Sequence, residues 1–258
     1  MSYLEALMAS TRARVAEAKA RVSQDVLEQR VAAAGPPRGF ARALVAGDEV
    51  AIIAEVKRAS PARGALDLDL NAGRLARAYA EGGAAAISVL TEPDHFRGSL
   101  EDLEAAAVAG LPLLRKDFTI DPFQVLEARA AGADAVLVIV KAVGSGVGSL
   151  LSAARAFGID ALTEVHDEAE LELALDAGAD LVGVNHRDLD TFEVDPERTV
   201  KLAPLVPPGR TLVGLSGVST RAQVEELGAA GASAVLVGES LVTAPDPVAA
   251  LRALRGAA

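Results

Sequence analysis

A repeated pattern of glycine-terminated helix and apolar strand constrains the fold of this 258-residue chain more than any other feature. In four segments, an Ala-rich stretch ends at glycine and an apolar run follows. The segments read EGGAAAISVL, AAGADAVLVIV, DAGADLVGVN and AAGASAVLVG, with matching glycines at Gly83, Gly132, Gly178 and Gly231. Successive glycines are 49, 46 and 53 residues apart. Because this is about twice the length of one strand-and-helix unit, each interval is predicted to contain another strand.

Apolar runs of strand length occupy the three intervals and precede the first repeat. They are VAIIAEV at residues 50–56, PLLRKD at 112–117, DALTEV at 160–165 and TLVGLS at 211–216. The stretches between strands mostly open with Asp, Asn, Ser or Thr and close at glycine, as capped helices do. Alternating strands and helices imply parallel strands, and eight such units usually close into a (β/α)8 barrel, the TIM barrel. An open doubly wound sheet is the alternative.

The chain length fits one such barrel, which needs roughly 250 residues. We therefore predict an α/β protein of one domain overall, with a (β/α)8 TIM barrel at residues 48–258. Residues 1–47 precede the first strand and contain an amphipathic helix with Leu4, Leu7 and Val15 on one side. We expect this N-terminal helical extension to pack on the barrel.

Composition and charge exclude several classes of function. The formal net charge of −11, without a basic patch, argues against a nucleic-acid partner or an anionic membrane surface. The absence of cysteine excludes disulfides, thiolate catalysis and Cys-based zinc sites. His95, His166 and His186 lack a metal-binding spacing, so no metal site is expected. The first 30 residues lack the apolar core of a signal peptide, and no apolar run approaches a bilayer span, so a cytoplasmic protein is predicted.

Charged residues stand on one face of the first predicted strand. Because side chains alternate along a strand, Ile53, Glu55 and Lys57 share one face, and the residues between them form an apolar face that must meet the helices. Glu55 and Lys57 are therefore predicted to point into the barrel near its carboxyl end. Burying charge there is costly unless the charges are paired or take part in chemistry. Two interpretations stay open, a structural ion pair and a catalytic pair.

Polar residues recur at the ends of three further strands. Lys116 ends the third strand and Glu164 the fifth, and Asn185 and Arg187 stand at the end of the sixth. Each alone is compatible with a solvated loop residue. Because the carboxyl ends of parallel strands meet at one end of the barrel, we expect these side chains to line one cavity. Lysines, carboxylates, an amide and a guanidinium together suit acid–base chemistry on an anion.

The last two strands end at glycine and serine. Ser216 and Gly217 follow the seventh strand, and Gly238 and Glu239 follow the eighth. Glycine lets backbone N–H groups approach an anion, and these two loops are the usual phosphate site of this fold. A plain tight turn is the alternative at either loop. The run GSGVG at residues 144–148 lacks the context of a nucleotide-binding motif and is predicted to be a flexible loop.

Several motifs together resemble those of the indole-3-glycerol-phosphate synthase family. In the order of the family they are AEVKRASPARG at residues 54–64, SVLTEPDHFRGS at 88–99, LPLLRKDF at 111–118, TEVHDEAEL at 163–171, VGVNHRDL at 182–189 and VLVGESL at 235–241. The patterns E-V-K-x-x-S-P and L-R-K-D-F are specific to this family. The N-terminal extension also resembles that of the family, which folds over the mouth of the barrel.

The resemblance implies an enzyme of tryptophan biosynthesis that closes 1-(2-carboxyphenylamino)-1-deoxyribulose 5-phosphate to indole-3-glycerol phosphate, with loss of carbon dioxide and water. It implies no cofactor and one partner, the phosphorylated substrate, and a monomer is compatible with the sequence. Lys116 matches the lysine that protonates the ribulose carbonyl oxygen. Glu55 and Glu164 match the carboxylates of the family, and Lys57 matches a lysine that contacts the anionic groups of the substrate.

Further positions match substrate-binding residues of the family. Asn185, which we also count as catalytic, and Arg187 match residues that position the substrate, and Ser60 and Ser88 match residues that line the cavity. The walls around the aryl ring are matched by Phe96, Phe118 and Leu189. The phosphate loops are matched by Ser216, Gly217, Gly238 and Glu239. We expect each of these residues to have the role of the family residue that it matches, because it stands in the same motif.

Two positions depart from the pattern of the family. His186 stands where Asn, Ala or Ser is usual, a change predicted to matter little. Leu215 stands where the family usually has a substrate-facing glutamate, and reduced turnover is predicted because leucine cannot accept a proton or hold a hydroxyl. Two alternatives remain. One is another sugar-phosphate isomerase or a Schiff-base aldolase on the same barrel, and the other is a silent barrel that only binds a phosphorylated metabolite.

Overall fold

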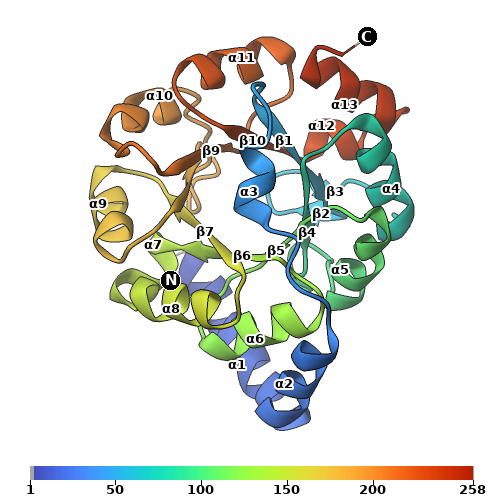
Figure 1. Cartoon of the computed structure of the whole chain (residues 1–258), viewed down its shortest axis with the longest axis vertical. Helices are drawn as coiled ribbons and strands as arrows, with labels where there is room; N and C mark the ends of the chain where they lie inside the picture. Colours follow the sequence, from blue (N-terminus) through green and yellow to red (C-terminus); the bar gives the residue numbers. More distant parts are fainter. Residues whose placement is uncertain (1–2, 258) are drawn as a thin grey trace.

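The computed structural model describes residues 3–257, and its centre is a closed barrel of parallel strands (Figure 1). The strands of this part of the chain are hydrogen-bonded in the order β1, β10, β9, β8, β7, β6, β5, β4 and back to β1. In chain order they are β1 (Ala51–Val56), β4 (Ala86–Leu90), β5 (Leu113–Lys116), β6 (Ala135–Ile139), β7 (Asp160–Val165), β8 (Leu181–Asn185), β9 (Thr211–Leu215) and β10 (Ala234–Val237). The predicted TIM barrel is therefore confirmed.

Helices cover the outside of the barrel between successive strands (Figure 1). They are α4 (Ala72–Gly82), α5 (Leu100–Ala106), η1 (Ala107–Ala109), α6 (Pro122–Ala130), α7 (Val140–Val143), η2 (Gly144–Gly146), α8 (Val147–Ala156), α9 (Glu168–Asp176), α10 (Arg198–Leu202), η3 (Ala203–Leu205), α11 (Arg221–Ala229), α12 (Glu239–Val242) and α13 (Pro247–Arg255). Polar N-caps fix where several begin; the side chains of Asn71 and Asp121, for example, accept hydrogen bonds from backbone N–H groups of α4 and α6. Across residues 3–257, no helix is long and apolar enough to cross a membrane.

The glycine-rich run at residues 144–148 is helical, so the prediction of a loop there was wrong. The short helix α7 passes into η2, which continues without a break into α8. Gly144 alone in this run adopts a positive φ, of 51°, and Gly146 has ordinary right-handed helical angles. Packing of Val147 and Leu150 in the core stabilises the helix over the weak propensity of its glycines.

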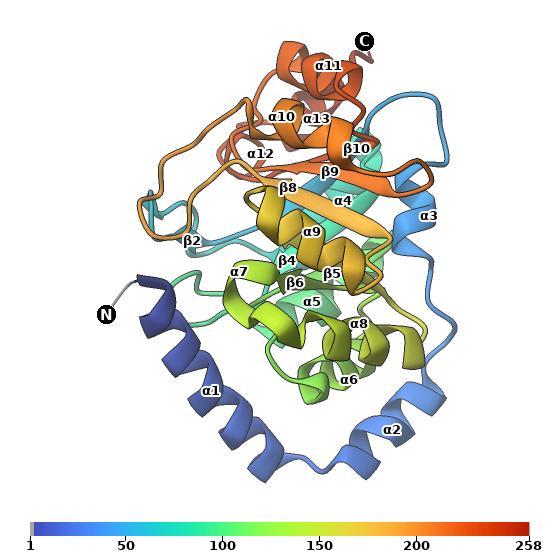
Figure 2. The same cartoon turned by 90° about the vertical axis from the view of Figure 1, so that its left-hand side faces the viewer.

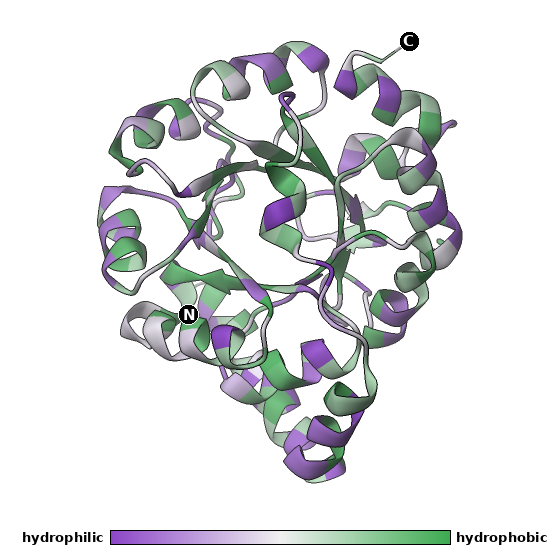
Figure 3. Ribbon diagram, in the orientation of Figure 1, coloured by the Kyte–Doolittle hydropathy of each residue, from purple (hydrophilic) through white to green (hydrophobic). Residues whose placement is uncertain are grey.

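Strand side chains alternate between two apolar layers. Ile52, Ala54 and Val56 belong to the larger layer between the strands and the helices, whereas Ile53 belongs to a cluster inside the barrel. This is the alternation that the sequence predicted for the first strand. Figure 3 shows the apolar residues concentrated on the strands, while polar residues alternate around the outer helices. Apolar side chains fill the interior of the barrel, which leaves the carboxyl end of the strands as the place where polar side chains can form a site.

The N-terminal segment runs from one end of the barrel to the other. α1 (Tyr3–Arg21) lies at the carboxyl end of the strands, α2 (Gln24–Ala33) packs on α6, and α3 (Phe40–Leu44) lies at the opposite end (Figure 2). The sequence predicted only one helix in this extension. Both α2 and α3 are additional to it.

The short helix α3 closes the amino-terminal end of the barrel. Phe40 and Leu44 are buried in the interior cluster. The backbone N–H of Ala41 donates to Asp160 Oδ2 at 2.8 Å, and that of Arg38 donates to Asp134 Oδ1 at 2.7 Å. Carboxylates at the beginnings of two strands therefore satisfy backbone donors of this segment. These contacts leave the carboxyl end as the open end.

Candidate active site

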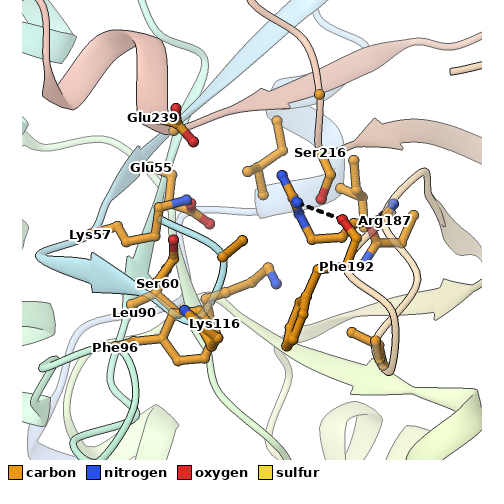
Figure 4. A pocket seen from close by; sticks show the side chains of 18 of the residues that line it. Glu55, Lys57, Ser60, Leu90, Phe96, Lys116, Arg187, Phe192, Ser216 and Glu239 are labelled. Carbon is orange, nitrogen blue, oxygen red and sulfur yellow. Dashed lines mark hydrogen bonds and ion pairs between the residues drawn. The ribbon is translucent and has the colours of Figure 1, made fainter. Parts of the chain in front are cut away.

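A pocket opens at the carboxyl ends of the strands, beneath α1 and the hairpin of β2 (Ala59–Ser60) and β3 (Gly64–Ala65) (Figure 4). The predicted site residues that line it are Glu55, Lys57, Ser60, Phe96, Lys116, Phe118, Asn185, Arg187, Leu189, Leu215, Ser216, Gly217, Gly238 and Glu239. Ser88 and Glu164 lie outside the set of described residues that line the pocket, and both are buried behind its wall. Residues from β1, β5, β8 and the last two strand ends thus meet at one cavity.

The pair on β1 forms a close ion pair. Lys57 Nζ lies 2.7 Å from Glu55 Oε1, and both side chains are largely buried. Gly238 at the end of β10 lies directly against this pair, because a Cβ at that position would stand 2.4 Å from Glu55 Oε1. A larger residue at this strand end would therefore displace the Glu55 carboxylate from its present position. The pair and the backbone of the predicted phosphate loop share one corner of the pocket.

A second charged group joins β5, β7 and β8. Lys116 Nζ lies 3.8 Å from Glu164 Oε2, and Asn185 Nδ2 donates to Glu164 Oε1 at 2.9 Å. Glu164 is only 1% exposed, whereas the side chain of Lys116 keeps 19% of its surface accessible. Asn185 Oδ1 in turn accepts the backbone N–H of Arg187 at 3.0 Å. The carboxylate therefore lies under the pocket wall and holds Lys116 and Asn185 at its surface.

The residues on either side of Lys116 anchor it from behind. Arg115, buried on the other face of β5, donates to Glu127 Oε2 at 2.9 Å and to Asp117 Oδ2 at 3.2 Å. Burial raises the pKa of Asp117, but the charges of Arg115 and Arg14 and two hydrogen bonds outweigh it and hold that pKa below its usual value. The L-R-K-D-F motif thus carries two residues that line the pocket, Lys116 and Phe118, and an ion network that fixes the strand end.

The end of β9 has an unusual backbone. Ser216 adopts a positive φ of 66° and Gly217 one of 78°. His186 Nδ1 donates to the carbonyl oxygen of Ser216 at 2.9 Å, and His186 Nε2 accepts from Thr199 Oγ1 at 2.7 Å. Burial lowers the pKa of His186, which favours the neutral ring, and in that form Nδ1 donates to Ser216 while Nε2 accepts from Thr199. His186 therefore holds the turn at Ser216, a role that the sequence analysis did not find.

The hairpin after β1 is joined to the opposite rim by one ion pair. Arg63 Nη2 lies 2.7 Å from Glu239 Oε1, while Ser60 faces the pocket from the hairpin. The carboxylate of Glu239 is thus directed to Arg63. Its backbone N–H stands at the first residue of α12. Glu239 contributes a backbone group to the predicted phosphate loop, and its charge links two rims of the pocket.

Apolar and aromatic side chains complete the pocket wall. Phe96, Phe118 and Leu189 lie where the sequence predicted them, and Leu90, Phe192, Leu236 and others join them. Tyr3 at the start of α1 packs edge-on against Phe192, with ring centroids 5.0 Å apart, and against His95 at 5.6 Å. Tyr3 was missed because nothing at the start of an amphipathic helix distinguishes a pocket residue from a packing residue.

One group of side chains has the spacing of a metal site. Within residues 3–257, ligand atoms of Glu92, Asp94 and His95 lie within 4.8 Å of one another. The carboxylate of Glu92 already accepts hydrogen bonds from the backbone N–H groups of Asp94, His95 and Phe96. The same carboxylate therefore serves to order the loop after β4. This ordering fixes Phe96 in the pocket wall.

Comparison with known proteins identifies the family. The model of the family described as indole-3-glycerol phosphate synthase matches residues 4–254. The chain belongs to the indole-3-glycerol phosphate synthase family. The synthase of Roseiflexus sp. (strain RS-1) is 46% identical over 265 aligned positions, covering 99% of this chain and 98% of the relative. That of Parafrankia sp. (strain EAN1pec) is 49% identical, covering 96% and 92%. This assigns the chain to the carboxy-lyases of tryptophan biosynthesis, as the motifs predicted.

Solved structures of lower identity share the barrel. A 3-hexulose-6-phosphate synthase has a TM-score of 0.64 at 19% identity, covering 80% of this chain and 99% of that one. Thiamine phosphate pyrophosphorylase from Pyrococcus furiosus has a TM-score of 0.63 at 18% identity, covering 84% and 96%. At these identities the likeness concerns the fold alone.

Leu215 and His186 are the two departures from the motif of the indole-3-glycerol phosphate synthase family, and Leu215 is the one that removes a carboxylate. Its side chain is 1% exposed and belongs to the cluster inside the barrel, although it reaches the pocket surface. A Cβ at Gly183 would lie 2.8 Å from Leu215 Cδ1, so the leucine fills the space above this glycine. An apolar side chain thus occupies the strand end between the polar groups of β8 and β10.

Proposed function

We propose that this chain is an active indole-3-glycerol phosphate synthase whose turnover is limited by Leu215. What supports the proposal most is one arrangement. The β1 pair Lys57–Glu55 and Lys116, which is backed by the buried Glu164, face one pocket whose opposite rim is glycine-rich backbone. Such a pocket suits a phosphorylated sugar whose carbonyl must be protonated while its ring closes.

In the proposed complex the substrate lies with its phosphate at the ends of β9 and β10. Backbone N–H groups of Gly217 and Glu239 and the Ser216 hydroxyl are the donors for the dianion. The aryl ring lies against Phe96 and Phe118, and its carboxylate faces a cation of the pocket. Binding at both ends then holds the ribulose carbonyl near Lys116, so that orientation contributes to the rate.

Ring closure in this scheme begins with a proton from Lys116. Lys116 Nζ donates it to the ribulose carbonyl oxygen, and the aromatic carbon bearing the carboxylate attacks the carbonyl carbon. The bond to that carboxylate breaks, carbon dioxide leaves, and its electron pair restores the aromatic ring. Glu164 Oε2, 3.8 Å from Lys116 Nζ, holds the lysine side chain at the pocket surface for this step.

Loss of water completes the indole. The hydroxyl formed at the former carbonyl carbon leaves with a proton from an acid, and the neighbouring carbon gives up a proton to a base. Lys57 and Glu55, 2.7 Å apart at the same pocket, are the proposed acid and base for this step. The overall products are indole-3-glycerol phosphate, carbon dioxide and water, so atoms balance without an added co-reactant.

Leu215 is the proposed cause of reduced turnover. The family glutamate offers a charge-assisted hydrogen bond to substrate, and such a bond is worth roughly 1.5 to 3 kcal/mol. If the bond strengthens in the transition state, its loss slows the reaction about ten- to a hundredfold. The same residue supports the second candidate function, a silent barrel that binds the phosphorylated metabolite without converting it.

The proposal is tested with purified protein and the carboxyphenylamino-deoxyribulose phosphate. Indole fluorescence and released carbon dioxide should rise together in a one-to-one ratio, and dialysis against a chelator should leave the rate unchanged. Binding without product would favour the silent barrel. Covalent trapping of a keto-sugar phosphate by borohydride, without indole formation, would favour a Schiff-base aldolase.

A further inference from the structure

A buried histidine stands directly behind Glu164, between two carboxylates. His166 follows β7 and is 8% exposed. Its Nδ1 lies 3.0 Å from Glu170 Oε2 of α9, and its Nε2 lies 3.7 Å from Glu164 Oε1. Glu170 Oε2 also accepts the backbone N–H of His166 at 2.8 Å. The ring is therefore fixed in place by α9 and directed at the carboxylate under the pocket.

The two carboxylates beside the ring indicate which of its nitrogens carry protons. Because Glu170 is a carboxylate, Nδ1 must donate to it. In a neutral ring Nε2 would then turn a lone pair toward Glu164, which is unfavourable at 3.7 Å. Within residues 3–257, Nε2 is buried and has no hydrogen-bond partner, so no other group relieves that contact. A doubly protonated ring between the two carboxylates removes the conflict.

We propose that His166 and Glu170 form a positioning pair that keeps the Glu164 carboxylate ionised and oriented beneath Lys116. The inference deepens the proposed function, because it concerns the proton chemistry of the same site. His166 does not reach the pocket, so it acts only through Glu164. Removing the pair should change how turnover depends on pH, which a purely structural role would not do.

The charges around the pair agree with this role. Burial lowers the pKa of His166, but the hydrogen bond that the ring donates to Glu170 and the charges of Glu164 and Glu170 outweigh both burial and the opposing charge of Arg198, so that pKa is raised. Glu164 is faced by Lys116 from β5 and by the neutral amide of Asn185 from β8. His166 is thus the second cation beside this carboxylate. Loss of His166 therefore leaves Lys116 as the one cation partner of the Glu164 carboxylate among the described residues.

Three variants test the proposal on the full chain. Glu170→Gln keeps an acceptor for the backbone N–H but removes the charge, and His166→Asn removes the cation. Both should move the acidic limb of the pH–rate profile to higher pH and lower kcat by about five- to tenfold at pH 6, as loss of an interaction with a charged group implies. Glu172→Gln, at an exposed position on the same helix, is the matched control and should leave the profile in place.

A second measurement does not depend on turnover. Imidazole NMR resonances of the three histidines, assigned by single substitution, report the titration of His166 directly. Glu164→Gln and Glu170→Gln should each lower the titration midpoint of His166, and Glu172→Gln should not. The proposal is overturned if His166 titrates alike in all of these proteins, or if the acidic limb stays fixed in an active enzyme. An inactive wild type with coupled titrations would sink the proposed function and leave the pair standing.

Discussion

The two halves of the pocket rim are built from different parts of the chain. On the side of β1, β5 and β7, the functional atoms are charged side chains that lie close to one another, as in the Lys57–Glu55 pair and the Lys116–Glu164 pair. On the side of β9 and β10 they are backbone groups at Ser216–Gly217 and Gly238, held by a neutral histidine and lined by a leucine. The first half is suited to moving protons, the second to holding an anion.

Because the two halves differ in this way, substitutions in them should impair the enzyme differently. Changes in the charged half should lower kcat while substrate still binds. Changes in the backbone half should raise KM, because an anion bound equally in ground and transition state contributes uniform binding. Leu215 is the exception, since it stands in the backbone half at a position where the family has an acid.

The largest effect is expected at Lys116. Lys116→Ala removes the proposed general acid, and kcat should fall about 10²- to 10⁴-fold while circular dichroism stays unchanged. Lys201→Gln, on the exposed surface of α10, is the control and should lie within a factor of two of wild type, since surface pairs contribute little. Near wild-type turnover of the Lys116→Ala protein would end the division between the two halves.

Leu215 offers the next largest effect, in the opposite direction. Leu215→Glu should raise kcat about ten- to a hundredfold through one regained charge-assisted hydrogen bond. It should also lower the melting temperature, because the new carboxylate is placed where an apolar side chain fills the space above Gly183. Glutamine has nearly the shape of glutamate but no charge, so the Leu215→Gln protein separates the effect of the charge from the effect of the side-chain shape. A glutamate variant no faster than the parent would show that position 215 does not limit turnover.

His186 should affect binding more than chemistry. His186→Phe removes both hydrogen bonds that hold the Ser216 turn, and KM should rise about tenfold with a smaller change in kcat, since about 1.4 kcal/mol corresponds to that factor. Steady-state kinetics measures the two constants. An equal fall in kcat with constant KM would place His186 on the chemical side of the comparison.

The same histidine makes a prediction about pH. Because burial lowers the pKa of folded His186, the unfolded state binds the proton more readily, so its contribution to stability is complete above the unfolded value of about 6.5. That contribution is lost as pH falls through the folded pKa. The free energy of unfolding of wild type should therefore decline more steeply below pH 6 than that of His186→Phe. Parallel denaturant curves at each pH would contradict this.

The smallest effect is expected at Tyr3, at the start of the helix α1 that lies over the pocket. Tyr3→Leu removes the two edge-on ring contacts to His95 and Phe192, each worth about 0.5 to 1.5 kcal/mol. KM should rise roughly threefold, and limited proteolysis of α1 should become faster. Tyr3→Phe keeps the ring and should lie much closer to wild type. Equal behaviour of the two variants would exclude the ring contacts as the cause.

The charged half was predictable from sequence because strand alternation has a period of two residues. That period placed Glu55 inside and Ile52 outside, and the repeat placed Lys116 and Asn185 at equivalent strand ends. The same alternation carries Glu164 under the wall rather than into the pocket, since its hydrogen bond to Asn185 holds it at 1% exposure. How deeply a side chain at a strand end is buried depends on its hydrogen-bond partners, and the alternation of residues in the sequence does not show these partners.

The remaining features depend on contacts between distant segments. Phe40 lies in a five-residue helix, too short for an amphipathic pattern, and it is buried because this helix closes the amino-terminal end of the barrel. His186 gains its role from Thr199 and from a non-glycine residue, Ser216, in a left-handed turn. Neither histidine nor serine is a residue type that predicts a left-handed turn. Sequence therefore predicts which strand ends carry charge better than it predicts what holds their backbone.

We propose that this one pocket both binds the carboxyphenylamino sugar phosphate and closes its ring. A single-turnover experiment, with protein in excess over substrate, tests it most directly, because slow product release cannot then hide the chemical step. We expect wild type to convert all of the substrate to indole-3-glycerol phosphate. In the time that wild type needs for this conversion, the Lys116→Ala protein should bind the substrate and leave it unconverted. Saturated binding to wild type without any indole would contradict the account.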